Sequence, residues 1–467
     1  MEKYDAIIIG IGQAGNPLSA TLAEKGWKTA VIEREHPGGS CINYGCTPTK
    51  TMVASAHIAH MVRTADAFGI ETSAPKTNFQ KVIERRDNIV TKWREGIEKK
   101  MSETENIDYF FGEASFVGNK QVQVKMKSDD EGEFVLKEFS ADKIFINVGT
   151  SPRISEVEGL ADVDYLTAKT MMHLQEPPKH LIILGGGYIG LEFGQMYRRF
   201  GSKVSIIQDD AQLAPKEDED VAEAIQDFLK EESIDIYLNS ELSKVEKSAS
   251  GIRVHLSGDK QKKIEGSHLL IAIGTTPNTQ ALNLEKTDVK LKKHGYIEVN
   301  EHLETNVEGI FALGDCKGGP EFTHISYDDY RIINDFLFGA KLRKMNDRMV
   351  PYTMFTKPEL GRVGLNEKLA RKKGIKYKIS QMPMSSAARA IEANRTTGLL
   401  KVLIDPETKK FLGASCLADI GGELMSMIQI AMMGGLTYED LRDGVMAHPT
   451  YAETLNNLFA SVEDPEE

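Results

Sequence analysis

The amino-acid sequence predicts an α/β fold with two Rossmann-like domains followed by a C-terminal α+β domain. Three observations support this prediction. A strand, a tight glycine turn and a helix follow one another from Tyr4, and the same succession recurs from His180. From Pro351 onward, strands and helices continue without a glycine turn. The chain has 467 residues, which is enough for about three domains.

The first unit has the full pattern of a dinucleotide site. An apolar strand, Tyr4–Ile9, leads into a glycine-rich turn at residues 10–15, and the next strand, Thr29–Glu33, ends in an acid. Such glycines let the backbone approach a pyrophosphate at a helix N-terminus, and a carboxylate such as Glu33 suits ribose hydroxyls. The candidate glycines are Gly10, Gly12 and Gly15.

A polar helical stretch at residues 76–102 follows, and then short strands between residues 108 and 148 with a charged hairpin tip at 128–132. Two buried strands, at 142–148 and 269–273, end in similar ways. Each is followed by a glycine, Gly149 or Gly274, at a point where we expect the chain to cross between domains.

The second unit repeats the dinucleotide pattern. Strand His180–Leu184 leads into a glycine turn, helix Leu191–Phe200 and strand Val204–Gln208. Its candidate residues are Gly185, Gly187, Tyr188 and Gly190. Two such units predict two dinucleotide sites; the alternative is that one of them is a vestige.

If the second dinucleotide site takes a nicotinamide nucleotide, the choice between NADH and NADPH depends on Gln208, which stands at the position equivalent to Glu33. An acid there favours NADH and arginines favour the NADPH phosphate, so glutamine alone is ambivalent. Asp209 and Asp210 follow and would repel a 2′-phosphate, whereas Lys216 could bind one. We therefore expect NADH to be preferred and NADPH tolerated.

Cys41 and Cys46 lie just beyond the first unit. On a regular helix this spacing is too long for a relaxed disulfide, so we expect irregular backbone at Cys41, a tight turn at Gly45 and a helix from near Thr47. A helix N-terminus favours thiolate at Cys46. A constrained disulfide is reducible, which predicts a working redox pair rather than two core cysteines. Between two dinucleotide sites, the pair implies electron relay from nicotinamide through flavin to the disulfide.

Composition excludes several other classes. The formal charge of −12 argues against nucleic acid or an acidic membrane surface as partner. The longest nearly apolar run, Leu424–Leu436, is too short to span a bilayer, and no secretory signal is visible. With four cysteines in the chain, Cys316 and Cys416 are expected to be buried and inert, as in a cytoplasmic protein. Methionines near Met425 suit core packing better than copper binding, and we expect no metal site.

These landmarks resemble the flavoprotein disulfide reductases, or pyridine nucleotide-disulfide oxidoreductases. That family includes dihydrolipoamide dehydrogenase, glutathione reductase and mercuric reductase. The Cys-x4-Cys-x-Pro-x-Lys element at residues 41–50 is the most specific match. The resemblance implies FAD, a nicotinamide nucleotide and a homodimer. The domains it implies are an FAD-binding domain at 1–150, an NAD(P)-binding domain at 151–276, an FAD-domain return at 277–347 and a dimerisation domain at 348–467.

The resemblance also assigns site residues. For FAD these are Gly10, Gly12, Gly15, Glu33, Gly39, Ser40, Lys50, Gly149, Thr150, Gly314 and Asp315. For NAD(P) they are Gly185, Gly187, Tyr188, Gly190, Gln208 and Gly274. The catalytic residues are Cys41, Cys46, Lys50, Glu192, His448 and Glu453. Taken alone, Asp315 could be a turn or cap residue.

The resemblance gives each catalytic residue a role. Cys41 is expected to be the exposed attacking thiol, with His448 of the partner subunit exchanging its proton. Glu453 would orient that histidine, or it could complete a capping box begun at Thr450. Lys50 and Glu192 match a pair beside the flavin. Without the resemblance they would be a solvated lysine and a surface glutamate.

Within the family, residues 318–331 and 448–459 best match the reactive-chlorine-resistance reductases, which reduce hypothiocyanous acid and are credited with copper(II) reduction. The C-terminus lacks the vicinal cysteine pair of mercuric reductases. We therefore expect a small thiol-reactive oxidant as substrate, with hypothiocyanous acid first and copper(II) as a further acceptor. The alternatives are dihydrolipoamide dehydrogenase and a flavin-loaded binding subunit with vestigial catalysis.

Overall fold

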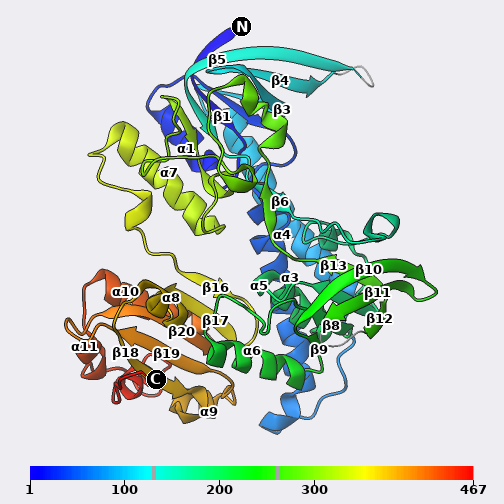
Figure 1. Ribbon diagram of the computed structural model, residues 1–467, viewed down its shortest axis with the longest axis vertical. Coiled ribbons are helices and arrows are strands. Elements are labelled where there is room, and N and C mark those ends of the chain that lie inside the picture. The colour runs from blue at the N-terminus through cyan, green and yellow to red at the C-terminus, as the bar shows by residue number, and fades with distance from the viewer. Residues whose placement is uncertain (129–132, 259–261, 466–467) are drawn as a thin grey trace. The chain divides into compact units, whose positions relative to one another are not determined.

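The computed structural model describes residues 1–128, 133–258 and 262–465, which divide into two compact units (Figure 1). The hairpin tip expected at 128–132 lies outside this set from residue 129 onward. The first unit comprises Met1–Thr51, Lys81–Arg153 and Gly274–Arg348. The second comprises Met52–Gln80, Ile154–Ile273 and Met349–Glu467. Residues 52–80 thus pack with the second unit, although they fall inside the segment predicted to bind FAD.

The first unit is built on a parallel sheet in the order β3-β2-β1-β5-β15. Its strands are β1 (Glu2–Ile9), β2 (Thr29–Glu33), β3 (Ile107–Gly118), β5 (Phe134–Ile146) and β15 (Ile310–Ala312). Strand β4 (Gln121–Lys127) pairs antiparallel with β3 and β5. From Ala6 to Ile9, successive residues of β1 alternate between two hydrophobic clusters, one on each face. Both faces are therefore covered, as expected for parallel strands.

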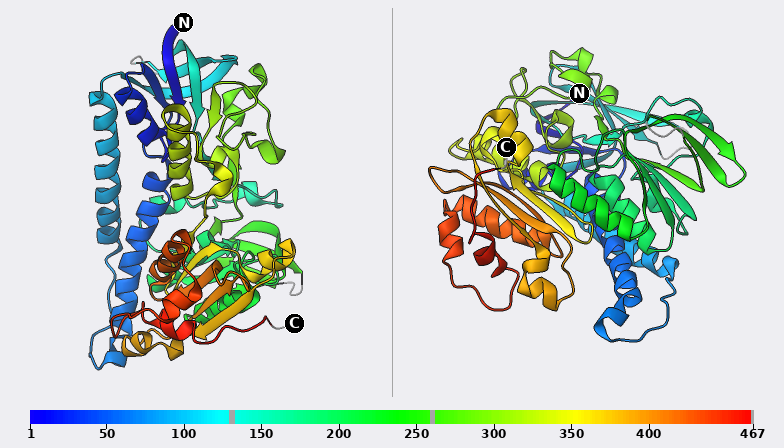
Figure 2. Two further views of the ribbon diagram at one scale, coloured as in Figure 1. Left: turned by 90° about the vertical axis from the view of Figure 1, so that its left-hand side faces the viewer. Right: turned by 60° about the horizontal axis from the view of Figure 1, so that its bottom comes forward.

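Helices α1 (Gly15–Glu24) and α7 (Thr323–Phe338) pack against each other in the first unit. Helix α4 (Phe79–Glu103) is one uninterrupted helix (Figure 2), close to the stretch predicted from the sequence. Two shorter segments carry the cysteines. They are α2 (Gly39–Asn43) and the first turns of α3 (Cys46–Arg63).

The second unit contains the other Rossmann-like sheet, with parallel order β13-β7-β8-β9. Its strands are β7 (His180–Leu184), β8 (Lys203–Ile207), β9 (Asp235–Tyr237) and β13 (His268–Ile271). Helices α5 (Tyr188–Arg199) and α6 (Glu219–Glu231) accompany it. An antiparallel sheet of β10 (Ser240–Ser248), β11 (Gly251–Gly258) and β12 (Lys262–Gly266) follows. The repeat predicted from the glycine turns is thus a repeat of structure.

The C-terminal part of the second unit is an antiparallel sheet in the order β16-β17-β20-β19-β18 (Figure 1). The strands are β16 (Tyr352–Met354), β17 (Glu359–Gly364), β18 (Lys378–Pro383), β19 (Leu399–Ile404) and β20 (Phe411–Ala418). The helices are α8 (Glu367–Lys373), α9 (Ala388–Glu392), α10 (Gly421–Met433), α11 (Tyr438–Arg442) and α12 (Thr454–Leu458).

Helix α10 accounts for the apolar run at 424–436. It packs on β17 and β20 and buries Leu424, Met425 and Ile428, while Ile430 and Met433 stay exposed. Met425 is thus a core side chain. No described helix combines the length and the apolar character that a membrane span needs.

Candidate active site

The cysteine pair lies where two helices meet. Cys41 is inside α2, and Cys46 is the first residue of α3. The break between the helices falls at Tyr44 and Gly45, whose N–H groups both donate to the carbonyl of Ser40, at 2.8 and 2.6 Å. The expectation of irregular backbone at Cys41 is therefore wrong, because α2 is too short to show a period in the sequence. The predicted helix start beside Cys46 is confirmed.

Cys41 and Cys46 are both in the thiol form, and they share one electrostatic environment. Contact with Cys46, and then burial, raise the pKa of Cys41, whereas Thr323 and Lys50 act in the opposite direction. The Cys46 Sγ lies 3.3 Å from the Thr323 Oγ1 at the start of α7. The pair therefore holds a first negative charge much more readily than a second.

The exposures of the two thiols differ from the prediction. Cys46 is exposed and Cys41 is half-buried, so the expectation that Cys41 is the exposed thiol is wrong for the single chain. Cys41 lies within α2, whereas Cys46 is the first residue of α3. Cys46 is also close enough to Asp315 to raise the pKa of that carboxyl. Cys46 is thus the thiol on the side of the expected flavin turn.

The first glycine turn forms a tight cradle around Asn147. A Cβ on Gly10, which has φ +95°, would lie 2.4 Å from the Asn147 carbonyl oxygen, and one on Gly15 would lie 2.3 Å from the Gly10 oxygen. The Asn147 side chain donates to the Gly10 carbonyl at 3.2 Å. Beyond the turn, a Cβ on Gly39 would meet the Gly12 Cα at 3.0 Å. Close packing therefore requires glycine at Gly10 and Gly15, and at Gly39, where φ is +64°, it leaves little room for a Cβ.

Glu33 supports the same turn from the end of β2. Its Oε2 accepts from the N–H of Ile11 at 3.0 Å, and its Oε1 accepts from the N–H of Glu35 at 2.9 Å. Burial raises the pKa of Glu33, and these backbone donors act against that rise. Each carboxylate oxygen keeps a second lone pair for a ribose hydroxyl.

Asp315 lies in a turn held by a buried ion network. The N–H of Gly314, at φ +68°, donates to the Asp329 Oδ2 at 2.8 Å. Asp329 is fully buried, with Lys317 Nζ at 3.1 Å and Arg348 Nη1 at 2.6 Å. Burial, and then the charge of Glu321, raise the pKa of Asp315 to about 7.

The alternative reading of Asp315 as a helix cap does not hold. It lies inside the short 3-10 helix Gly314–Lys317, whose N-cap residue is Leu313 with no side-chain cap. Cys316, next to it, is fully buried, and burial raises the pKa of this thiol and of Cys416 to about 12. Both are inert thiols, as expected.

The second glycine turn repeats the first. A Cβ on Gly185 would lie 2.4 Å from the Ala272 oxygen, and one on Gly190 would lie 2.1 Å from the Gly185 oxygen. Gln208 Oε1 accepts from the N–H of Gly186 at 2.6 Å. The predicted residues of this site therefore converge around one turn, with Tyr188 as the first residue of α5.

His448 and Glu453 form a hydrogen-bonded dyad. His448 Nδ1 lies 2.8 Å from Glu453 Oε2. The histidine is exposed, with 66% of its side-chain surface accessible. The N–H of Glu453 donates to Thr450 Oγ1 at 3.2 Å, which is half of a capping box. The Glu453 side chain contacts His448, while the Glu453 backbone N–H contacts Thr450. The contact that orients the histidine and the contact that holds the turn are therefore both present.

Lys50 and Glu192 belong to different units, and their pairing stays a prediction. Glu192 is 4% exposed on α5, and its Oε1 accepts from the N–H of Phe355 at 2.8 Å. It is not the surface glutamate that its residue type alone suggests. Gly149 and Gly274 take positive φ values of 63° and 106° where the chain leaves each sheet, and Thr150 opens the crossing strand β6 (Thr150–Pro152).

Sequence reasoning missed three residues that complete the site: Asn147, Thr323 and Asp329. Asn147 lies two residues before Gly149, so its position at a strand end was a usable signal. Thr323 and Asp329 fall inside the stretch whose resemblance was noted, but nothing local marks them as partners of Cys46 and Gly314.

Comparison with known proteins gives the family of the chain. The family model for pyridine nucleotide-disulphide oxidoreductases matches residues 4–329. The model for the dimerisation domain of the same family matches residues 350–459. The chain belongs to this family. It is therefore an NAD(P)H-dependent flavoprotein disulfide oxidoreductase, and the dimerisation domain supports a homodimer.

Individual relatives are similar over nearly the whole chain. RclA of Escherichia coli (strain K12), a probable pyridine nucleotide-disulfide oxidoreductase, is 37% identical over 99% of this chain and 100% of its own. A mercuric reductase of Staphylococcus aureus is 33% identical over 97% of this chain and 81% of its own. A dihydrolipoyl dehydrogenase of Bacillus subtilis (strain 168) is 31% identical over 97% of both.

Solved structures give the same relationship. The Cu(II) complex of the HOCl-induced flavoprotein disulfide reductase RclA from Escherichia coli superposes with a TM-score of 0.89. The two chains are 36% identical, and the match covers 98% of this chain and 99% of that one. The chain is therefore similar to RclA in both sequence and fold.

The family implies FAD and a pyridine nucleotide, and the residues fit both groups. A Cβ on Gly149 or on Gly187 would meet no atom within 4 Å, so the backbone at both glycines borders open space. The free lone pairs of Glu33 and the carboxylate of Asp315 suit the hydroxyls of a flavin dinucleotide. When bound, FAD would supply two-electron redox chemistry, and the transfer of those electrons to Cys41 and Cys46 stays a prediction.

Proposed function

We propose that the protein uses NADH to reduce hypothiocyanous acid, a small electrophilic oxidant of thiols, through Cys41 and Cys46. The similarity to RclA over 99% of the chain supports this choice, because that protein is HOCl-induced. Copper(II) is a further acceptor in this proposal, since a Cu(II) complex of RclA is known.

The observation that carries the proposal is the single usable thiol pair. The chain has four cysteines, and two of them are fully buried with pKa values raised to about 12. No second thiol pair is left to hold a metal ion or to relay electrons to a distant acceptor, so an acceptor must react at the Cys41–Cys46 pair itself. A small oxidant that reaches the Cys41–Cys46 pair directly needs no such relay.

The chemistry balances with the residues present. The Cys41 thiolate attacks the sulfur of hypothiocyanous acid, a sulfur–sulfur bond forms, and the oxygen leaves as water after taking one proton. The Cys46 thiolate then attacks the Cys41 Sγ, expels thiocyanate and closes the disulfide. The hydride equivalent of NADH, which carries two electrons and one proton, and one further proton from solution return the disulfide to two thiols and leave NAD⁺.

The proton for the departing water comes from His448 of the partner subunit in this proposal. An imidazole can take up and return a proton near neutral pH. The Glu453 carboxylate, 2.8 Å from Nδ1, fixes the ring so that Nε2 carries out the exchange.

The test is stopped-flow oxidation of the NADH-reduced enzyme by hypothiocyanous acid, lipoamide, glutathione disulfide and copper(II). We expect the fastest reoxidation with hypothiocyanous acid and much slower reoxidation with the two disulfides. Fast reaction with lipoamide alone would instead establish a dihydrolipoamide dehydrogenase. Failure of NADH to reduce the enzyme would indicate vestigial catalysis.

The preference for NADH rests on Gln208. Its Nε2 donates to Asp209 Oδ1 at 3.0 Å and to Asp210 Oδ2 at 3.1 Å, so both carboxylates are held beside the glycine turn. A 2′-phosphate there would meet two negative charges. We expect a higher kcat/KM with NADH than with NADPH, and a preference of about tenfold for NADPH would contradict the proposal.

A further inference from the structure

The loop at residues 209–218 connects β8 to α6 and is attached to the second nucleotide site. The N–H of Ala214 donates to the Gly186 carbonyl at 2.8 Å. Leu213 is buried beside Gly186, where a Cβ on the glycine would meet it at 2.7 Å. Gln212 Nε2 donates to the Glu217 carbonyl at 3.1 Å and braces the loop internally. A displacement of the loop would therefore move the glycine turn.

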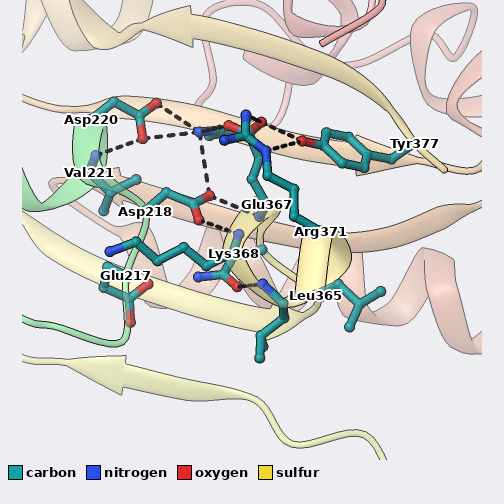
Figure 3. Close-up of polar contacts among 12 residues, drawn as sticks. Glu217, Asp218, Asp220, Val221, Leu365, Glu367, Lys368, Arg371 and Tyr377 are labelled. Carbon is teal, nitrogen blue, oxygen red and sulfur yellow. Dashed lines mark hydrogen bonds and ion pairs between the residues drawn. The ribbon is translucent and has the colours of Figure 1, made fainter. Parts of the chain in front are cut away.

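The other side of this loop is held by the C-terminal domain, through α8. Asn366 Nδ2 donates to the Lys216 carbonyl at 2.9 Å. The first N–H groups of α8, on Glu367 and Lys368, donate to the Asp218 carboxylate at 3.1 Å each (Figure 3). Lys368 Nζ also donates to Gln212 Oε1 at 2.9 Å. The carboxylate of Asp218 thus satisfies donors that would otherwise have no partner at a helix start.

Lys401 of β19 lies at the centre of these contacts. It is 2% exposed, and its Nζ lies 2.9 Å from Asp220 Oδ2 and 3.4 Å from Asp218 Oδ2, with Glu367 as a third acid partner. Tyr377 donates to the other oxygen of Glu367 at 2.6 Å (Figure 3). A buried ammonium needs such partners to offset its lost hydration.

Next to this cluster, a second buried pair joins the same two segments. Arg362 of β17 lies 2.8 Å from Glu217, and both side chains are under 5% exposed. The loop itself contains a strained residue, since Ala214 has φ +45°. Such a conformation is unfavourable for a residue with a side chain and persists only where the surroundings hold it. Here the surroundings are the glycine turn on one side and the C-terminal domain on the other.

We propose that Lys401, Lys368 and Asn366 are positioning residues for the nicotinamide nucleotide. Through the loop at 209–218 they fix the glycine turn, and with it the site for the pyrophosphate and adenosine ribose. The C-terminal domain, whose family role is dimerisation, therefore also sets nucleotide affinity. This inference concerns the nucleotide half-reaction alone, so it stands or fails independently of which oxidant is reduced.

The test uses the homodimeric flavoprotein and calorimetric titration with NAD⁺ and with ADP-ribose, which lacks the nicotinamide. For Lys368→Met we expect the dissociation constants for both to rise about threefold to tenfold, because one charge-assisted hydrogen bond to the loop is lost. Lys368→Arg keeps a donor of similar reach and should restore wild-type affinity. The KM for the oxidant and the flavin spectrum should keep their wild-type values.

Lys401→Met should have the larger effect, and Lys409→Met is its matched control. Lys409 is in the same domain, but its ion pair with Glu439 is half-exposed and includes no residue of the loop. If Lys401→Met does not fold, Lys368→Met decides, since Lys368 is only half-buried. Unchanged nucleotide affinity in folded Lys368→Met, or an equal loss in Lys409→Met, would overturn the proposal.

Discussion

Thr323→Val tests whether the hydroxyl at the start of α7 tunes the redox thiols. The side chain keeps its shape but loses the Oγ1 that lies 3.3 Å from the Cys46 Sγ. A hydrogen bond to a charged group contributes about 1.5–3 kcal/mol. Cys46 is exposed, so we take a smaller value of about 1 kcal/mol, equivalent to about a fivefold change in thiolate population.

The sign of the effect follows from the direction in which Thr323 shifts the thiol pKa. Thr323 acts to lower the pKa of Cys41, so its loss raises that pKa and moves thiol reactivity to higher pH. The assay is the rate of iodoacetamide alkylation of the NADH-reduced enzyme from pH 6 to pH 9. At pH 7 we expect about a fivefold slower reaction in Thr323→Val, with convergence at high pH where both forms are ionised.

Thr323→Ser is the matched control because it keeps the hydroxyl and should retain the wild-type profile. Peptide mapping shows which cysteine is alkylated. Superimposable pH profiles for wild type and Thr323→Val would refute the reasoning, and so would an equal loss in Thr323→Ser.

Three further variants test other parts of the protein. Cys41→Ser should still be reduced by NADH in a rapid-mixing experiment yet lose steady-state turnover, whereas retained turnover would reassign the attacking thiol. Glu453→Gln should slow oxidant reduction about threefold to tenfold by loosening His448, with flavin reduction unchanged as the internal control. Burial and then the charge of Arg199 lower the pKa of His57 to about 4, so protonation below its unfolded value near 6.5 favours unfolding. The free energy of unfolding of His57→Gln, measured with urea, should therefore fall less between pH 6.5 and pH 4 than that of the wild type. An equal fall in both proteins would contradict this.

Local patterns in the sequence were enough to locate the scaffold. Strands β2 and β7 begin and end where their apolar runs do, and both glycine turns lie where the spacing placed them. These features depend on neighbours along the chain. The short helix around Cys41 was missed because five residues hold less than two helical periods.

Long-range partners could not be predicted from such patterns. Thr323 is 277 residues from Cys46, and Lys401 is 181 residues from Asp220. The residue type of Lys401 and its place on an apolar strand do not identify its acidic partners, because those depend on how separate elements pack. The burial of Glu192 has the same origin, since its partner is a backbone N–H contributed by the C-terminal domain.

Gln208, which is ambivalent in the sequence, has a defined hydrogen-bonding role in the structure. In the first unit, Glu33 Oε2 accepts from the N–H of Ile11, the second residue of the glycine turn. In the second unit, Gln208 Oε1 accepts from Gly186, which has the same place in its own turn. The amide therefore keeps the structural half of the acid's role. Its NH2 group replaces the other carboxylate oxygen and, unlike it, can only donate.

That donor group changes what the site can accept. A carboxylate at this position binds ribose hydroxyls directly, whereas the Gln208 amide is occupied by Asp209 and Asp210. The negative charge is thus moved from the strand end to the first residues of the loop that the C-terminal domain holds. Because the same loop carries both the charge and the attachment, nucleotide choice and nucleotide affinity should change together when its attachment to α8 is weakened.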